Sequence, residues 1–173
     1  AVSVPANTRL KAPEIGYLLQ DSDPTVVVVE PELWERVLTV KDRAPGLKAV
    51  FLTGKDRAAG ADLLSDLIER PAPYRVGASA TEEDVHSILY TSGTTGNPKG
   101  AMLCHRNFIT NSLNTQALCR LSSGDRLLIM APLFHVTALN SQLIKIVHAG
   151  ATGVLMRAFK TEEILDTIER ERI

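Results

Sequence analysis

Short β-branched runs alternate with helix-like patterns along the whole chain. The run TVVVVE at 25–30 has no polar alternation, which is typical of a strand covered on both faces. Other strand-like runs lie at 1–4, 47–54, 84–93, 125–132 and 151–156. Helical patterns lie at 12–23, 31–42, 60–70, 106–121, 135–150 and 160–173. This βα repetition predicts an α/β fold, with a mainly parallel, doubly wound sheet and helices on both faces.

Several helices carry recognisable end signals. Pro13 fits the first turn of the helix at 12–23, and Gly150 is expected to close the helix at 135–150. Thr161 is predicted to be the N-cap of the last helix, with two glutamates in its first turn. The stretch at 70–84 is rich in proline, glycine and alanine and is predicted to be a connector.

The composition of the chain limits the classes of molecule that it could bind. The chain has 173 residues, 45% apolar and 23% charged, which suits one soluble domain or a large piece of one. Its net charge of −1 supplies no basic field for nucleic acid or an anionic membrane, and no apolar run is long enough to cross a bilayer. Cys104 and Cys119 form no zinc-binding pattern. We therefore expect reduced thiols, no metal site within the chain and a cytoplasmic location.

The segment YTSGTTGNPKG at 90–100 differs from the rest of the chain. Its three glycines allow positive φ and close approach of another backbone, so that consecutive amides can converge on an anion. Four Ser and Thr hydroxyls add donors, and Lys99 adds a compact positive charge. The segment follows a strand, and in α/β folds ligands bind at the carboxyl ends of strands. It predicts a polyphosphate site, because a plain surface turn does not need hydroxyls and a lysine beside its glycines.

Spacing excludes two well-known phosphate loops. In the Walker pattern a Gly-Lys pair is followed by Ser or Thr, but here Lys99 stands between Pro98 and Gly100. The GxGxxG dinucleotide pattern is also absent.

The same segment resembles the signature loop of the AMP-forming acyl-CoA synthetases, an adenylate-forming superfamily that includes peptide-synthetase adenylation domains and luciferases. APLFHVTALN at 131–140 resembles the next motif of that family, and the segments at 4–29 and 149–173 resemble its flanking regions. The resemblance covers nearly the whole chain and is weakest between 47 and 81.

The resemblance implies an enzyme that joins a carboxylic acid to ATP, releases pyrophosphate and passes the acyl group to the thiol of coenzyme A. It implies Mg²⁺ beside the phosphates, and a fatty or aryl acid as substrate. The residues that it assigns to pyrophosphate binding are Thr91, Ser92, Gly93, Thr94, Thr95, Gly96 and Lys99.

His135 is the catalytic candidate that the resemblance adds. The matching family position borders the acyl pocket and shifts between the two reaction steps, so its implied role is gating and pocket lining rather than general-base catalysis. The alternative is a histidine that caps the helix beginning there. His86 is expected to be structural, and His105 to start a helix. His148 is expected near a helix C-terminus, where a partial positive charge is favourable. Thr137, Ala138 and Asn140 are candidates to touch the acid.

The family's later motifs have no counterpart in the sequence. Those motifs hold adenine, ribose and Mg²⁺, and a C-terminal domain carries a catalytic lysine. We therefore expect residues 1–173 to be a partial N-terminal AMP-binding domain that lacks its start, its later motifs and its C-terminal domain. Such a piece is expected to be inactive alone and prone to self-association through exposed strand edges. Two alternatives stay open: a non-catalytic phosphate-binding fragment, and an adenylation domain that loads a carrier protein.

Overall fold

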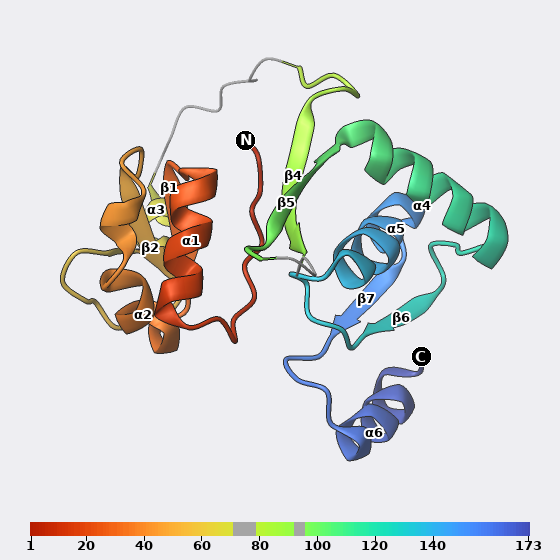
Figure 1. The fold of residues 1–173 in the computed structure, drawn as a ribbon. Coiled ribbons are helices and arrows are strands. Elements are labelled where there is room, and N and C mark those ends of the chain that lie inside the picture. The colour runs from red at the N-terminus through yellow and green to blue at the C-terminus, as the bar shows by residue number, and fades with distance from the viewer. Residues whose placement is uncertain (71–78, 92–95) are drawn as a thin grey trace. The chain divides into compact units, whose positions relative to one another are not determined.

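The computed structural model describes residues 1–70, 79–91 and 96–173 (Figure 1). The chain divides into two compact units, and each is described by itself. One unit comprises Ala1–Pro5 and Ala80–Ile173, and the other comprises Ala6–Ser79. In the described part of the chain, no helix is both long enough and apolar enough to span a bilayer.

The unit Ala6–Ser79 contains a small parallel sheet with helices. Its strands are β1 (Val26–Val29), β2 (Ala49–Leu52) and β3 (Asp62–Leu63), paired in that order and all parallel. Its helical segments are α1 (Ala12–Ser22), η1 (Pro31–Leu33), α2 (Trp34–Leu38), η2 (Lys41–Arg43) and α3 (Leu64–Glu69). The parallel strands and the first helices confirm the predicted α/β pattern.

The core of this unit lies between the sheet and its helices. Val29, Trp34 and Leu52 belong to one buried cluster, and Leu52 is only 1% exposed. The opposite side of β1 is only about half covered by the described residues, since Val26 and Val28 are 48% and 53% exposed. The expectation that both faces of this strand are covered is thus met only in part by the described residues.

Two local expectations in this unit have different outcomes. Pro13 lies in the first turn of α1, as predicted, and Glu14 accepts the Lys11 N–H at 2.8 Å to complete a capping box. The helix predicted at 60–70 begins four residues late. Asp62 and Leu63 instead form β3, because they pair with β2, and α3 follows from Leu64.

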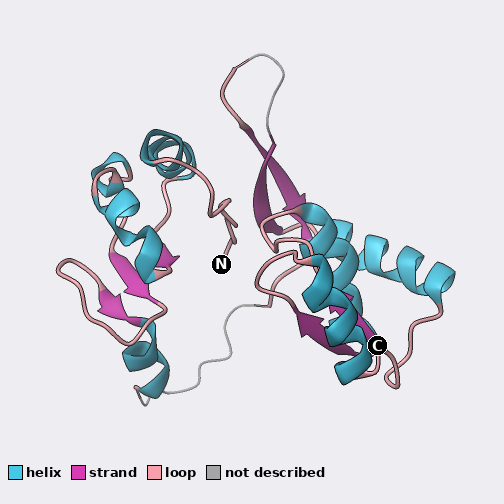
Figure 2. Cartoon of the chain, turned by 90° about the horizontal axis from the view of Figure 1, so that it is seen from below, coloured by secondary structure: helices cyan, strands magenta, loops and turns pink. Residues whose placement is uncertain are grey.

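The other unit contains two two-stranded sheets. Strands β4 (Val85–Thr91) and β5 (Lys99–Cys104) are antiparallel, whereas β6 (Arg126–Ile129) and β7 (Thr152–Leu155) are parallel. Its helices are α4 (His105–Cys119), the π-helix η3 (Thr137–Ile144), α5 (Lys145–Ala149) and α6 (Thr161–Glu171). The strand β5 was not predicted, and β4 and β5 wind around each other as a ribbon (Figure 2). The N-terminal run contributes one parallel bridge, from Ser3 to Ser87.

The helix η3–α5 packs over the β6–β7 pair. Ile129, Ala138 and Ile146 form its buried cluster, with 1%, 0% and 4% of their surfaces exposed. Gly150 adopts a left-handed conformation at the end of α5, with φ of +66°, so the predicted glycine stop is confirmed. The predicted N-cap Thr161 is wrong by one residue, because Lys160 holds the extended cap conformation and Thr161 is already helical.

Candidate functional site

The glycine-rich segment connects the two strands of an antiparallel hairpin. Thr91 pairs with Lys99, and Tyr90 pairs with Gly100, so the pairing ends at the connection. Among the predicted phosphate-binding residues, the structure describes Thr91, Gly96 and Lys99. The other four, Ser92, Gly93, Thr94 and Thr95, lie outside the described residues.

The two paired residues at the end of the hairpin both offer donors to solvent. Thr91 and Lys99 are exposed. Within the described ranges, the Lys99 ammonium forms no ion pair with any carboxylate, so its charge is free to meet an anion. An exposed lysine beside a threonine hydroxyl and backbone amides is a donor set that suits phosphate oxygens.

Glycine is required at two positions of this hairpin for different structural reasons. Gly96 has φ of +144°, which side chains rarely adopt, and a Cβ added there would meet nothing within 4 Å. A Cβ on Gly100 would lie 2.7 Å from Ile88 Cγ2 and 3.3 Å from Tyr90 Cζ. Gly96 therefore serves the turn, whereas Gly100 serves the close packing of β4 on β5.

The hairpin corrects the position predicted for the loop. The sequence placed the loop between a strand and a helix, but β5 intervenes, and α4 begins only at His105. Because β5 runs antiparallel to β4, its last residue Cys104 pairs with Val85 at the start of β4. The N-terminus of α4 is therefore at the opposite end of the ribbon from Thr91 and Lys99. Hairpin amides and Lys99, not a helix terminus, would supply the positive potential for phosphate.

His135 lies in the segment between β6 and η3, in the same unit as the hairpin. Its Nδ1 accepts the Thr137 N–H at 3.3 Å, and its side chain is exposed. Thr137 is the first residue of η3, so this contact places the His135 ring at the start of that helix, where Val136 is the N-cap residue. His135 forms no hydrogen bond with the described hairpin residues.

The other histidines pack within the same unit. The His86 ring contacts His105, with centroids 5.0 Å apart, and Phe108, with centroids 4.3 Å apart. His148 Nδ1 is 2.8 Å from Ser112 Oγ. His105 is the first residue of α4, as expected. These contacts fit the structural role predicted for His86, and His148 lies in the last turn of α5, as expected.

We expect His86 to make the free energy of unfolding depend on pH. Burial lowers the pKa of His86 below its ordinary value, and the positive charges of His105 and the N-terminal amino group lower it further. The unfolded chain then binds the proton more readily, so stability is present above about pH 6.5 and falls as the pH drops below it. Thermal unfolding at a series of pH values from about 7.5 to 5 measures this slope.

The His86→Gln protein tests the assignment of that slope. Glutamine does not titrate, so its unfolding temperature should fall less between the two ends of the series. An unchanged slope in this variant would show that other groups cause the pH dependence.

No group of three His, Cys, Asp or Glu side chains in the described ranges is arranged to hold a metal ion.

The chain matches known proteins over its full length. The family model described as "AMP-binding enzyme" matches residues 1–173. A feruloyl-CoA synthase of Amycolatopsis sp is 36% identical over 173 residues, which are all of this chain and 32% of the relative. The long-chain-fatty-acid–CoA ligase FadD13 of Mycobacterium tuberculosis is 31% identical, over all of this chain and 33% of the relative. The chain thus spans about a third of the length of these curated relatives.

The fold comparison agrees with the sequence comparison. The crystal structure of the anthranilate CoA ligase AuaEII in complex with anthranoyl-AMP has a TM-score of 0.88 and 29% identity. The match covers 98% of this chain and 33% of that chain. Sequence and fold together show that this chain belongs to the AMP-binding enzyme family.

Proposed function

We propose that this chain is part of an AMP-forming acid–CoA ligase, in which it holds the pyrophosphate portion of ATP. The observation that carries the proposal is the β4–β5 hairpin, where Lys99 is exposed, forms no ion pair with a described carboxylate, and lies beside Thr91 next to the glycine-rich segment. The relatives support the reaction class, since they are named as CoA ligases or synthases, and one solved structure holds an acyl-AMP.

The donor set suits the leaving group of acid activation. A carboxylate oxygen attacks the α-phosphorus of ATP, the bond to the β-phosphate oxygen breaks, and pyrophosphate leaves with its electron pair. Donors fixed on the β- and γ-phosphates stabilise the charge that develops there. Lys99 would donate from its ammonium, and Thr91, Ser92, Thr94 and Thr95 from hydroxyls. Gly93 and Gly96 would bring backbone amides close to the phosphate oxygens.

The second half of the reaction transfers the acyl group. The coenzyme A thiolate attacks the acyl carbonyl, and AMP leaves with the electron pair of the mixed anhydride. Mg²⁺ bound to phosphate oxygens would offset their charge during the first half. We assign His135, which lies at the start of η3, to the border of the acid pocket and not to general-base catalysis. The substrate is a carboxylic acid of the fatty or aryl class.

Acid-dependent exchange of labelled pyrophosphate into ATP tests the proposal in the full-length enzyme that contains these residues. Ferulate and palmitate serve as probes of the two acid classes. We expect exchange with at least one of them, followed by thioester formation when coenzyme A is added. The absence of exchange with carboxylic acids would contradict acid activation, and loading of a carrier protein instead of coenzyme A would contradict the proposed acceptor.

The isolated 173 residues should show no exchange. They span about a third of the length of the curated relatives, so we infer that further parts of those enzymes are needed for turnover. Exchange by the isolated chain would contradict this inference and leave the reaction class intact.

A further inference from the structure

Helix α4 contacts the helix η3–α5 through polar side chains. Its outward positions include Ile109, Leu113 and Leu118, which are 44%, 52% and 85% exposed. The hydrogen bonds from α4 to the helix η3–α5 come from polar residues that lie between these exposed positions. We call this contact the polar seam, and it comprises Asn111 and Ser112 of α4 with Asn140, Ser141 and His148 of η3–α5.

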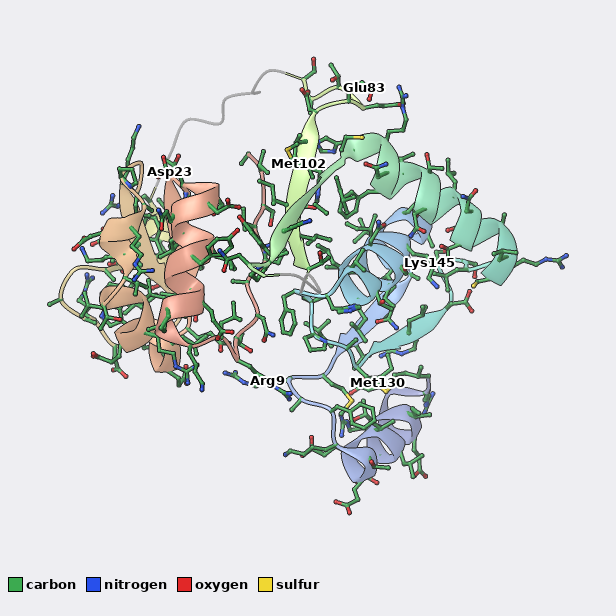
Figure 3. All side chains as sticks on the ribbon, in the orientation of Figure 1. Arg9, Asp23, Glu83, Met102, Met130 and Lys145 are labelled. Carbon is green, nitrogen blue, oxygen red and sulfur yellow. The ribbon has the colours of Figure 1, made fainter. Side chains whose placement is uncertain are left out.

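Hydrogen bonds connect the two sides of the polar seam. Asn111 Nδ2 donates to Asn140 Oδ1 at 3.2 Å and reaches Ser141 Oγ at 3.5 Å. The next residue of α4, Ser112, has its Oγ 2.8 Å from His148 Nδ1 of α5. Lys145, which is labelled in Figure 3, lies on α5 three residues before His148. It is only 8% exposed. Adjacent residues of α4 thus bond to both η3 and α5.

Asn140 is a buried residue of the polar seam that depends on its hydrogen-bond partner. It is 7% exposed, so water cannot replace Asn111 without a rearrangement. A buried amide that loses its partner keeps the full cost of having left water. The Asn111–Asn140 hydrogen bond is therefore specific to one alignment of the two helices.

The polar seam includes two residues of η3, and the backbone of η3 is unusual. Thr137–Ile144 is a π-helix, a form that is rare and that mostly occurs as single turns at functional sites. Asn140 and Ser141 are in its middle, and the His135 ring lies at its start. A rare backbone form persists when the surrounding structure supports it, and Asn111 supplies such support from α4.

We propose that Asn111 is a positioning residue, which aligns the His135 end of η3 with the hairpin that carries Lys99. The inference rests on the proposed function. Helix α4 follows β5 directly, since β5 ends at Cys104 and α4 begins at His105. A hydrogen bond from α4 to the middle of η3 therefore connects η3 to the hairpin through the β5–α4 junction, at the end of the ribbon opposite Lys99. Asn111 itself touches neither substrate.

Asn111→Ala in the full-length enzyme tests this connection. In acid-dependent pyrophosphate exchange, we expect KM for the acid to rise about tenfold, the effect of one lost buried hydrogen bond. KM for ATP should change little, because the β4–β5 pairing does not involve Asn111. Ferulate and palmitate are the probes, and whichever the wild type activates is used.

Two further variants separate alignment from general stability. Asn114→Ala changes the same residue type at an exposed position of the same helix and should behave like the wild type. Asn111→Asp should be close to the wild type, because the Asn140 amide can turn and donate to the carboxylate. Equal KM values for Asn111→Ala and Asn114→Ala, both folded, would overturn the proposal.

The Asn140→Ala variant completes a double-mutant cycle. If Asn111→Ala raises KM for the acid through the loss of the Asn111–Asn140 hydrogen bond, the double variant should have a KM no higher than that of the more affected single variant. Additive effects would overturn the proposal. If Asn111→Ala does not fold, Asn111→Leu is used instead. Equal KM values for the acid in Asn111→Leu and Asn111→Asp would then overturn the proposal. Wild-type enzyme without any exchange would instead contradict the proposed function.

Discussion

Lys99→Ala should lower acid-dependent pyrophosphate exchange by about 100- to 1000-fold in the full-length enzyme, the range for removing one preorganised donor from a developing charge. Lys99 is exposed, forms no ion pair with any described carboxylate, and pairs through its backbone with Thr91 at the end of the hairpin. Its removal should therefore cost activity and leave the fold intact. Steady-state exchange, together with the unfolding temperature, measures both effects.

Lys55→Ala is the matched control. Lys55 is also exposed, but it lies in the other unit of the chain and outside the hairpin. It should retain wild-type exchange. If Lys99→Ala also retained wild-type exchange, Lys99 would not hold the leaving pyrophosphate.

Ile129→Ala should lower the free energy of unfolding by about 2–5 kcal/mol, as for other large-to-small core substitutions. Ile129 lies in β6, is 1% exposed, and packs against Ala138 and Ile146 of the helix that follows His135. Because Ala138 and Ile146 belong to two successive helical segments, a cavity at Ile129 weakens both. Urea unfolding followed by circular dichroism measures the loss.

The control for this substitution is Val147→Ala. Val147 lies in α5 next to Ile146 but is 70% exposed. Its truncation should therefore change the free energy of unfolding by less than about 0.5 kcal/mol. Similar losses in the two variants would show that Ile129 is not in the core that supports η3.

The apolar pattern of the sequence located most of the strands and helices. Val26–Val29, Ala49–Leu52, Arg126–Ile129 and Thr152–Leu155 are strands because β-branched and aliphatic runs pack well on a pleated surface. The strand Lys99–Cys104 escaped prediction because it begins with a lysine and a glycine that also fit a loop. Its identity depends on pairing with β4, which is a tertiary contact.

The π-helix could not be predicted for a related reason. Its sequence, TALNSQLI, has no feature that distinguishes a π-helix from an α-helix. Its contacts with the rest of the fold are non-local, as in the hydrogen bond between Asn111 of α4 and Asn140, which joins residues 29 positions apart.

The chemistry of the candidate site was partly visible in the sequence. Glycines, hydroxyls and Lys99 close together predicted a polyphosphate site without any structure, and the family membership agrees with that interpretation. Asn111 was missed because a polar residue on a helix usually faces solvent. Only the structure shows that α4 turns Asn111 inward and Leu113 outward.

A crystal structure of the full-length enzyme with bound ATP tests the central claim most directly. We predict that the β- and γ-phosphate oxygens lie within hydrogen-bonding distance of Lys99 Nζ and the Thr91 hydroxyl, with connection amides directed at the same oxygens. ATP phosphates bound elsewhere, with Lys99 in solvent, would contradict the account.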